Sequence, residues 1–216
     1  MTADFPREIG DLTQGLSELG ITLPPAAVDR FRTYLELLER FHGQLHLISH
    51  RDHGQVSRRH FLPSLLAADY ASGRRRAADL GPGAGFPSLP IKIVQPELNL
   101  TLIESVGKKA HFLETLCAAL NLSGCEIVNG RAEAYPGPAF DLIFLKAAGP
   151  IRDWVLTIDR LLMVPGTAVF FKTLRRAGSE IAAVRTQLER AGFRWSIREL
   201  LTPLEQRPLA LVVLEK

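Results

Sequence analysis

The sequence predicts an α/β fold in which an N-terminal helical segment precedes a mostly parallel, seven-stranded sheet with an antiparallel last strand. Three observations support this prediction. Apolar residues recur at helical spacing over the first 70 or so residues, short apolar runs then alternate with amphipathic stretches, and a short polar loop joins the last two runs. Alternating strands and helices are typical of a parallel sheet with helices on both faces.

The helical segment is expected over residues 1–72. A helical apolar stripe is formed by Val28, Phe31, Leu35 and Leu38. An earlier helix is expected from Pro6 to Leu19. A later stretch from about Gly54 to Tyr70 must be kinked or split by Pro63, because proline lacks a backbone donor and clashes with the preceding turn. Residues 73–216 would form the sheet domain, and the two parts are expected to make one compact unit.

Seven short apolar runs are expected to be strands. They are residues 76–80, 98–104, 125–128, 140–146, 167–172, 193–199 and 208–215. Helical segments are expected between them at residues 87–94, 107–121, 151–162 and 177–191. Parallel neighbours need a crossover of about a dozen or more residues. The loop that holds Pro203 and Pro208 leaves no room for a helix, so the last strand is expected to run antiparallel to its neighbours.

The composition limits the classes of protein that fit. The chain has 216 residues, 46% of them hydrophobic, and a formal net charge of +3. No apolar run reaches the roughly 18–20 residues that cross a bilayer, and the first residues lack the apolar core of a secretory signal, so we expect a cytoplasmic protein without a membrane partner. Cys117 and Cys125 are expected to be buried free thiols. We expect no metal site, because the six histidines form no cluster at ligand spacing.

The strongest local motif is a glycine-rich loop, DLGPGAGFP at residues 79–87, between an expected strand and an expected helix. Glycines there allow a tight turn and a close approach of the backbone to a ligand. A second acid, Glu104, ends the next expected strand, 23 residues beyond Gly81. In dinucleotide-binding folds an acid about 20 residues after the first glycine binds ribose hydroxyls.

The details of this loop favour S-adenosylmethionine over NAD as the cofactor. The glycines follow a GxGxG spacing, and Phe86 stands where a dinucleotide motif has its third glycine. Asp79 precedes the loop, where it would repel a pyrophosphate. S-adenosylmethionine has no phosphate and carries a sulfonium and an ammonium group, which an acid suits. An NAD-dependent oxidoreductase is therefore kept only as a less favoured alternative.

Further segments, in the same order along the chain, extend the pattern. They are HLISHRD (46–52), RRHFLPSL (58–65), DLGPGAGFPSLPI (79–91), LIESVGKKAHFL (102–113), NGRAEAY (129–135), FDLIFLKAAG (140–149), VFFK (169–172) and RPLALVVLEK (207–216). With them the sequence, from about residue 25 to its end, resembles the bacterial small-subunit ribosomal RNA guanine-N7 methyltransferases, also called the glucose-inhibited division protein B family. The resemblance implies a Rossmann-like (class I) methyltransferase fold that binds S-adenosylmethionine, with small-subunit ribosomal RNA or the ribosomal subunit as partner.

The resemblance also implies roles for individual residues. Asp79 would lie below the methionine end of the cofactor, Glu104 or Ser105 near the ribose, and Ala132 and Glu133 around the adenine. The residues expected to bind the cofactor are Asp79, Gly81, Gly83, Gly85, Phe86, Glu104, Ser105, Ala132, Glu133 and Lys146.

Five residues differ from the family's pattern. His46 and Ile48 stand in the family's Asn-Leu-Thr, Pro63 replaces an acid, Ser88 a glycine, and Lys146 an arginine. Lysine lacks the two-pronged fork of a guanidinium group.

The residues after the fourth expected strand fit methyl transfer to guanine N7, a nitrogen that carries no proton. Leu145-Lys146-Ala147-Ala148-Gly149-Pro150 contains neither an Asn-Pro-Pro-Tyr motif nor a cysteine nucleophile. Proximity and orientation alone can supply as much as ~7–11 kcal/mol. We therefore expect Lys146 to hold guanine O6 beside the attacking nitrogen. Lys172, at the end of the next strand, is the second expected catalytic residue and would position the substrate.

Several cations are expected to contact RNA, and these are Arg59, His60, Lys172, Arg175, Arg176 and Arg207. Arg74, Arg75 and Arg76 are expected to be ordinary solvated residues, because they precede the first strand on the other edge of the sheet. A monomer is expected. Three alternatives stay open beside the favoured function: methylation of another RNA position, for which a lysine could act as base, an S-adenosylmethionine-binding RNA-associated protein without this activity, and the oxidoreductase.

Overall fold

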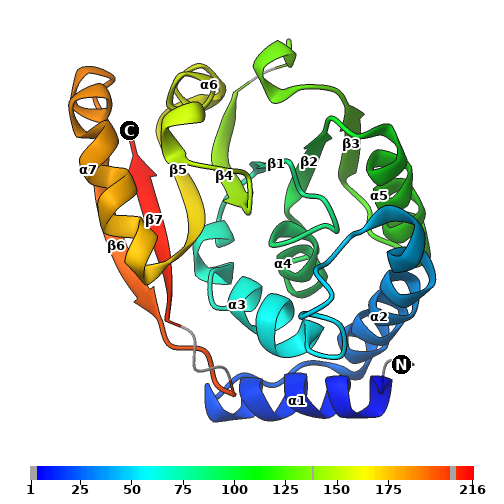
Figure 1. Ribbon diagram of the computed structural model, residues 1–216. Coiled ribbons are helices and arrows are strands. Elements are labelled where there is room, and N and C mark those ends of the chain that lie inside the picture. Colours follow the sequence, from blue (N-terminus) through cyan, green and yellow to red (C-terminus); the bar gives the residue numbers. More distant parts are fainter. Residues whose placement is uncertain (1–3, 138, 205–207) are drawn as a thin grey trace.

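The computed structural model describes residues 4–137, 139–204 and 208–216. Its centre is a seven-stranded sheet with the order β3-β2-β1-β4-β5-β7-β6, flanked by helices (Figure 1). The strands are β1 (Arg76–Leu80), β2 (Asn99–Glu104), β3 (Cys125–Asn129), β4 (Phe140–Lys146), β5 (Leu162–Thr173), β6 (Arg194–Leu200) and β7 (Leu209–Glu215). This is the predicted fold class.

The direction of the strands also follows the prediction. β1 to β5 pair in parallel, whereas β7 lies between β5 and β6 and is antiparallel to both. The prediction of a reversed last strand is therefore confirmed. The cause is the short connection after β6, which can turn the chain back but cannot carry it across the sheet.

β5 differs from its predicted bounds. It begins at Leu162, five residues before the expected start at 167, and includes Pro165 and Gly166. These two residues usually interrupt a strand, because proline cannot donate to the ladder. The structure accommodates them with a shift of register, since Phe140 pairs with Leu162 and Leu142 with Thr167.

Four helices connect the parallel strands and the last hairpin. They are α4 (Ser88–Val94), α5 (Gly107–Ala119), α6 (Val155–Leu161) and α7 (Leu174–Arg190). The segment expected to be one helix over 151–162 is divided into a 3₁₀ turn, η4 (Ile151–Asp153), and the short α6, while α7 begins three residues earlier than expected. A further 3₁₀ turn, η3 (Ala132–Ala134), follows β3.

The N-terminal part is helical, as predicted. It contains α1 (Phe5–Glu18), α2 (Pro25–Leu45), a π-helical turn η1 (Ser57–Phe61), α3 (Leu62–Leu65) and a 3₁₀ turn η2 (Ala68–Ala71). Pro63 lies in the first turn of α3, where its missing N–H costs little. The expected interruption at Pro63 thus takes the form of a π turn followed by a new helix start.

Two apolar clusters cover the two faces of the sheet. Because successive strand residues point to opposite faces, Ala77 and Leu142 pack with α1 to α5, whereas Ala78 and Ile143 pack with α6 and α7. The N-terminal helices share their cluster with α4 and α5, and Figure 1 shows them along one edge and one face of the sheet. The division of the chain at residue 72 stays a prediction.

The two cysteines differ in their burial. Cys117 is buried in α5, but Cys125 at the start of β3 is only half-buried, because β3 is an edge strand; both are free thiols. The expectation of two buried thiols was therefore wrong for Cys125. Among the described residues, no helix is long and apolar enough to cross a membrane.

Candidate functional site

The glycine-rich loop leaves β1 and enters α4 with three glycines in the left-handed region. The φ angles of Gly81, Gly83 and Gly85 are 72°, 57° and 96°. A Cβ atom added at Gly81 or Gly83 would meet no atom within 4 Å, whereas one at Gly85 would come within 2.5 Å of the Tyr34 hydroxyl oxygen. The first two glycines therefore border open space that a ligand can enter, and the third allows the N-terminal helices to pack against the loop.

Asp79, at the end of β1, is fully buried and only partly satisfied. Its Oδ2 accepts hydrogen bonds from the hydroxyl of Ser88 at 2.6 Å and from the Ser88 N–H at 3.3 Å. Its Oδ1 has no partner in the part of the chain that the structure describes. Burial raises the pKa of Asp79 to about 7, although the bonds from Ser88 act in the opposite direction. A buried carboxyl oxygen without a donor fits a cationic ligand.

Ser88 thus acquires a role that the sequence did not reveal. It stands at one of the positions that differ from the family's pattern, and its hydroxyl makes the closest contact to Asp79. Glu104, at the end of β2, is also buried and binds the neighbouring backbone. It accepts hydrogen bonds from the N–H of Gly83 at 3.0 Å and of Val106 at 2.9 Å. The expected ribose ligand therefore also fixes the glycine-rich loop.

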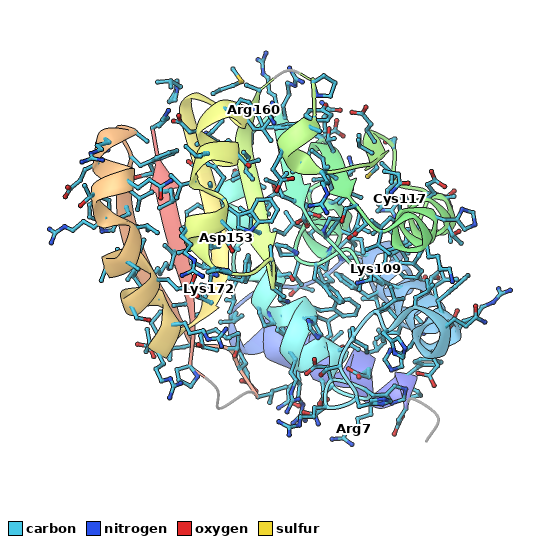
Figure 2. The ribbon with its side chains drawn as sticks, turned by 45° about the horizontal axis from the view of Figure 1, so that its top comes forward. Arg7, Lys109, Cys117, Asp153, Arg160 and Lys172 are labelled. Carbon is cyan, nitrogen blue, oxygen red and sulfur yellow. The ribbon has the colours of Figure 1, made fainter. Side chains whose placement is uncertain are left out.

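The expected adenine region lies after β3. Ala132 is buried in the same apolar cluster as Leu80 and Ile103, at the ends of β1 and β2, while Glu133 is exposed. Arg160 of α6 donates hydrogen bonds to the carbonyls of Ala132 and Glu133 at 2.8 and 3.1 Å. Figure 2 labels Arg160, a supporting residue that no pattern in the sequence signalled. Ser105 is exposed directly after β2.

Phe86 does not face open space. The residue is 5% exposed and its ring stacks on two others, that of Tyr34 at a centroid distance of 5.6 Å and that of His60 at 4.5 Å. The Tyr34 hydroxyl donates a hydrogen bond to the carbonyl of Ala84 at 2.7 Å. Two N-terminal elements, α2 and η1, thus contact and support the glycine-rich loop. The role of Phe86 as a cofactor ligand stays a prediction.

Lys146 is the last residue of β4 and is enclosed by aromatic rings. Its Nζ lies 5.1 Å from the ring centre of Phe86, 5.7 Å from that of Phe171, and 3.1 Å from His60 Nδ1. Burial lowers the pKa of Lys146 to about 7, while Asp52 and Asp79 act to raise it. Burial, and then the charge of Lys146, lower the pKa of His60 to about 4. His60 is packed against Phe86 and hydrogen-bonded within the protein, and its expected contact with RNA stays a prediction.

A cavity of about 650 Å³ opens beside Lys146, at the carboxyl edge of β4 and β5. Its lining includes Arg59, Lys146, Phe171, Lys172, Arg176 and Glu180. Ligands of open α/β sheets bind in such a crevice, outside the carboxyl ends of the strands. The structure therefore brings four of the predicted substrate residues to one cavity.

Lys172 has partners of its own. Its Nζ forms an ion pair with Glu180 Oε2 at 2.8 Å and donates to the carbonyl of Gly149 at 2.5 Å, and Glu180 also accepts from the N–H of Ile151. Figure 2 shows Lys172 at this end of β5. An ion-paired ammonium group has no lone pair to accept a proton, so this geometry favours positioning over base catalysis. No pattern in the sequence marked Glu180.

The other expected cations lie in different surroundings. Arg175 and Arg176 are exposed in the first turn of α7. Arg59 donates hydrogen bonds to the Arg51 carbonyl at 2.6 Å and to Asp52 Oδ1 at 3.0 Å. Arg207 lies outside the described residues.

The three arginines before β1 are not all solvated as expected. Arg74 donates to Thr167 Oγ1 at 3.0 Å and to the Asp141 carbonyl at 3.3 Å, so it joins β4 to β5. Arg76 lies over the ring of Phe140. Only Arg75 is exposed. The expectation of a bland surface was therefore wrong for two of the three.

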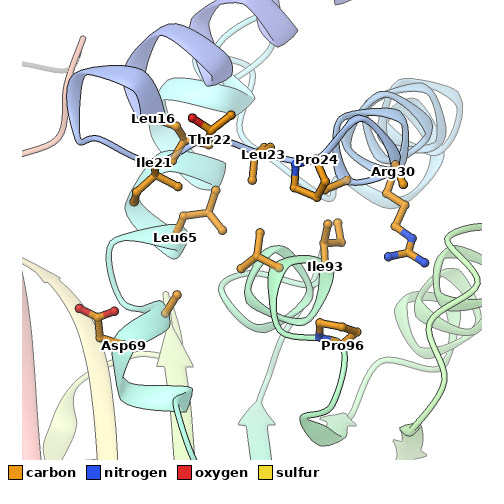
Figure 3. Close-up of a pocket in the computed structure, with 14 residues that line it drawn as sticks. Leu16, Ile21, Thr22, Leu23, Pro24, Arg30, Leu65, Asp69, Ile93 and Pro96 are labelled. Atoms are coloured by element: carbon orange, nitrogen blue, oxygen red, sulfur yellow. The ribbon is translucent and has the colours of Figure 1, made fainter.

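A second pocket is separate from this site. It has a volume of about 410 Å³ and is mostly apolar, with Leu16, Leu23 and Ile93 in its lining (Figure 3). It lies at the C-terminal end of α4, whereas the glycine-rich loop enters the other end, about 10 Å away for a helix of seven residues. We therefore exclude this pocket from the candidate site.

The fold is shared with solved methyltransferase structures. The glycopeptide N-methyltransferase MtfA complexed with sinefungin matches with a TM-score of 0.59 and 12% identity over 71% of this chain and 85% of that one. M. jannaschii TYW2 in complex with AdoMet matches with a TM-score of 0.56 and 12% identity over 71% and 73%. At these identities the likeness shows the fold alone, and it confirms the predicted Rossmann-like methyltransferase architecture.

Sequence relatives are more specific. The model of the family described as rRNA small subunit methyltransferase G matches residues 27–200. The chain is 32% identical to the Ribosomal RNA small subunit methyltransferase G of Halalkalibacterium halodurans over 97% of this chain and 91% of the relative. It is 34% identical to the protein of that name from Alkalilimnicola ehrlichii over 82% and 80%. Because both matches span most of the molecule, the chain belongs to the rRNA small subunit methyltransferase G family.

Proposed function

We propose that this protein transfers the methyl group of S-adenosylmethionine to N7 of a guanine in small-subunit ribosomal RNA. The observation that carries the proposal is the position of Lys146. In a member of this family, a half-buried cation at the carboxyl end of β4 lies between the glycine-rich loop and a cavity of about 650 Å³. A purine placed there would meet the ammonium group of Lys146 as a hydrogen-bond donor. Methylation of guanine N7 needs no general base, because that nitrogen carries no proton.

The residues around the glycine-rich loop fit S-adenosylmethionine. The Oδ1 of Asp79, which has no partner among the described residues, would accept from the ammonium group. Gly81 and Gly83 would border the ligand, and Glu104 would bind the ribose. When bound, the cofactor supplies a methyl group on a positively charged sulfur. The buried carboxyl of Asp79 suits that charge, and it would repel the pyrophosphate of NAD.

The substrate side provides orientation rather than proton transfer. Guanine N7 has a free lone pair, so its methylation requires no proton removal, and holding the base in line is the main task of the protein. An N–H of Lys146 would donate to guanine O6, next to N7, and would stabilise the charge that shifts onto the base. Lys172 would shape the cavity through Gly149 and Glu180.

Cations near the cavity would hold the RNA backbone. Arg175 and Arg176 stand in the first turn of α7, where the helix dipole disfavours positive charge, so they do not serve the stability of that helix. Their position instead suits phosphate groups, and Arg59 in the cavity lining is a further candidate. Arg207 lies outside the described residues and is a candidate from the sequence alone. Such contacts position the RNA without reading its sequence. We further propose that the protein is a cytoplasmic monomer; analytical ultracentrifugation tests the oligomeric state.

The decisive experiment uses radiolabelled S-adenosylmethionine and small ribosomal subunits, or their naked RNA, from cells that lack the modification. The expected result is label at one guanine. N7-methylation makes its ring reducible by borohydride, and aniline then cleaves the RNA chain at that nucleotide. Label at a ribose or another base would support methylation of a different position. Binding of the cofactor without transfer would support the S-adenosylmethionine-binding alternative, and calorimetric binding of NAD the oxidoreductase.

A further inference from the structure

The Lys146 ammonium group is held by a chain of polar groups that begins in the N-terminal segment. Lys146 Nζ lies 3.1 Å from His60 Nδ1, and His60 Nε2 lies 3.5 Å from Asp52 Oδ2. The second contact is electrostatic, because Nε2 makes no hydrogen bond among the described residues. Asp52 is itself fixed, because Oδ2 accepts from the Ser49 hydroxyl at 2.6 Å and Oδ1 from Arg59 at 3.0 Å. The three groups come from the loop after α2, from η1 and from β4, which are distant in the sequence.

The His60 ring has little freedom to rotate. It stacks on Phe86 at a centroid distance of 4.5 Å and an interplanar angle of 11°, and the Ser64 hydroxyl holds its backbone carbonyl at 2.6 Å. An ammonium group can only donate, so Nδ1 must accept from it. The proton of the neutral ring is then on Nε2, the atom that faces Asp52.

Among the described residues, the hydrogen bond to His60 Nδ1 is the directional contact that orients the Lys146 ammonium group. Phe86 and Phe171 present ring faces, which attract the charge without fixing the directions of the N–H bonds. Asp52 and Asp79 act on Lys146 through their charge, from the loop after α2 and from β1. A lysine side chain is flexible and its ammonium group can rotate, so a single acceptor decides where the other N–H bonds point.

We propose that His60 is a positioning residue for methyl transfer, which holds the Lys146 ammonium group so that a remaining N–H points at the O6 of the target guanine. The charge of Asp52 faces Nε2 of His60 and favours this arrangement. The proposal rests on the function proposed above. His60 also supports the cofactor side of the site, since the Phe86 ring on which it stacks belongs to the glycine-rich loop. The same imidazole therefore touches both the cofactor loop and the group that holds the substrate.

Two variants of His60 separate positioning from packing. His60→Phe keeps a ring on Phe86 but removes the acceptor, whereas His60→Asn keeps an acceptor near the place of Nδ1 but removes most of the ring. We expect His60→Phe to lower kcat by about 10- to 100-fold, with the KM for RNA and the affinity for S-adenosylmethionine within twofold of wild type. His60→Asn should retain the larger part of kcat. The reverse order of the two rates would assign His60 to packing and overturn the proposal.

The pH profile gives a second readout that packing would not move. If the ammonium form of Lys146 is the active one, kcat falls as the pH rises through its pKa of about 7. Asp52→Asn removes a negative charge that favours this form, so the alkaline limb should move to lower pH. Asp69→Asn changes an exposed residue on the turn η2; it is the matched control and should leave the limb unchanged. An unmoved limb in Asp52→Asn would contradict the role of Asp52.

A measurement without turnover keeps the proposal separate from the proposed function. Nitrogen-15 NMR of histidine-labelled protein should show His60 as the tautomer that carries its proton on Nε2, and Lys146→Met should shift the Nδ1 resonance. If the tautomer is found but no guanine N7 is methylated, the proposed function fails while the contact stands. A proton on Nδ1 in the wild type would refute the positioning chain itself.

Discussion

The two halves of the site are built in different ways. On the side of β1 and β2, the backbone shapes the site. Three glycines adopt left-handed conformations, and Glu104 is held by two main-chain N–H groups. On the side of β4 and β5, side chains from distant elements shape the site, since Lys146 is held by His60 and Lys172 by Glu180. The glycine spacing of the first half is visible in the local sequence, although α2 and η1 support the loop. The second half exists only after the chain has folded.

Lys146→Ala tests the side-chain half and should have the largest effect. Loss of a donor that stabilises developing charge costs about 10²- to 10³-fold in kcat. Binding of S-adenosylmethionine, measured by calorimetry, should change much less, because the glycine-rich loop is untouched. The assignment of Lys146 fails if turnover and cofactor affinity both remain at the level of the wild type.

Gly85→Ala tests the backbone half. The new Cβ would approach the Tyr34 hydroxyl and Leu89 at a φ of +96°, so we expect a loss of about 2–4 kcal/mol in the free energy of unfolding. Gly83→Ala meets no atom within 4 Å and should cost only about 1–2 kcal/mol while weakening cofactor binding. Urea denaturation measures the free energy of unfolding of both variants. Equal losses would contradict the difference in surroundings between Gly83 and Gly85.

Asp79→Asn should weaken S-adenosylmethionine binding about 10- to 100-fold, because a charge-assisted hydrogen bond is lost. In the wild type the affinity should rise with pH and level off above the Asp79 pKa of about 7, since only the ionised carboxylate attracts the cation. Ser88→Ala removes hydrogen bonding that favours the ionised form, so the midpoint should move to higher pH. Calorimetry between pH 5.5 and 8.5 measures this; a flat profile would exclude Asp79 as a ligand of the cation.

Arg175→Ala and Arg176→Ala should have the smallest effects, severalfold each in RNA affinity. Each lost phosphate contact should lower the slope of log K against log salt concentration by about 0.7–0.9. Arg194→Ala is the control, because Arg194 is exposed at the opposite edge of the sheet, where it pairs in register with Glu215. If all three variants give the same slope, the cations of α7 do not touch the RNA.

The same comparison explains what the sequence could and could not reveal. The strands, their order of appearance, the glycine-rich loop and its two acids were predictable, because apolar periodicity and glycine spacing are local signals. The positions that differ from the family's pattern were visible, but their consequences were not. Ser88 turned out to bond Asp79, and Lys146 to meet His60, 86 positions away in the sequence. Nothing local marks Arg160 or Glu180, since their partners are main-chain atoms and a lysine brought near by folding.

The strand β5 shows a second limit. Pro165 and Gly166 are turn formers by local chemistry, and the prediction began the strand only after them, at residue 167. Pairing with β4 and β7 outweighed that tendency, because the ladder from Thr167 to Thr173 against β7 already fixes the chain. Local preference is weakest where two neighbours hold a strand from both sides.

The buried carboxyl of Asp79 has a consequence for the energetics of the unliganded protein. Its pKa is raised in the folded state, so the folded form binds more protons than the unfolded form between about pH 4 and 7, and stability falls as the pH rises through that window. A cationic ligand reverses the preference by favouring the ionised carboxylate. Capture of the cofactor near neutral pH should therefore release a fraction of a proton to solvent, which would appear as a binding enthalpy that depends on the ionisation enthalpy of the buffer.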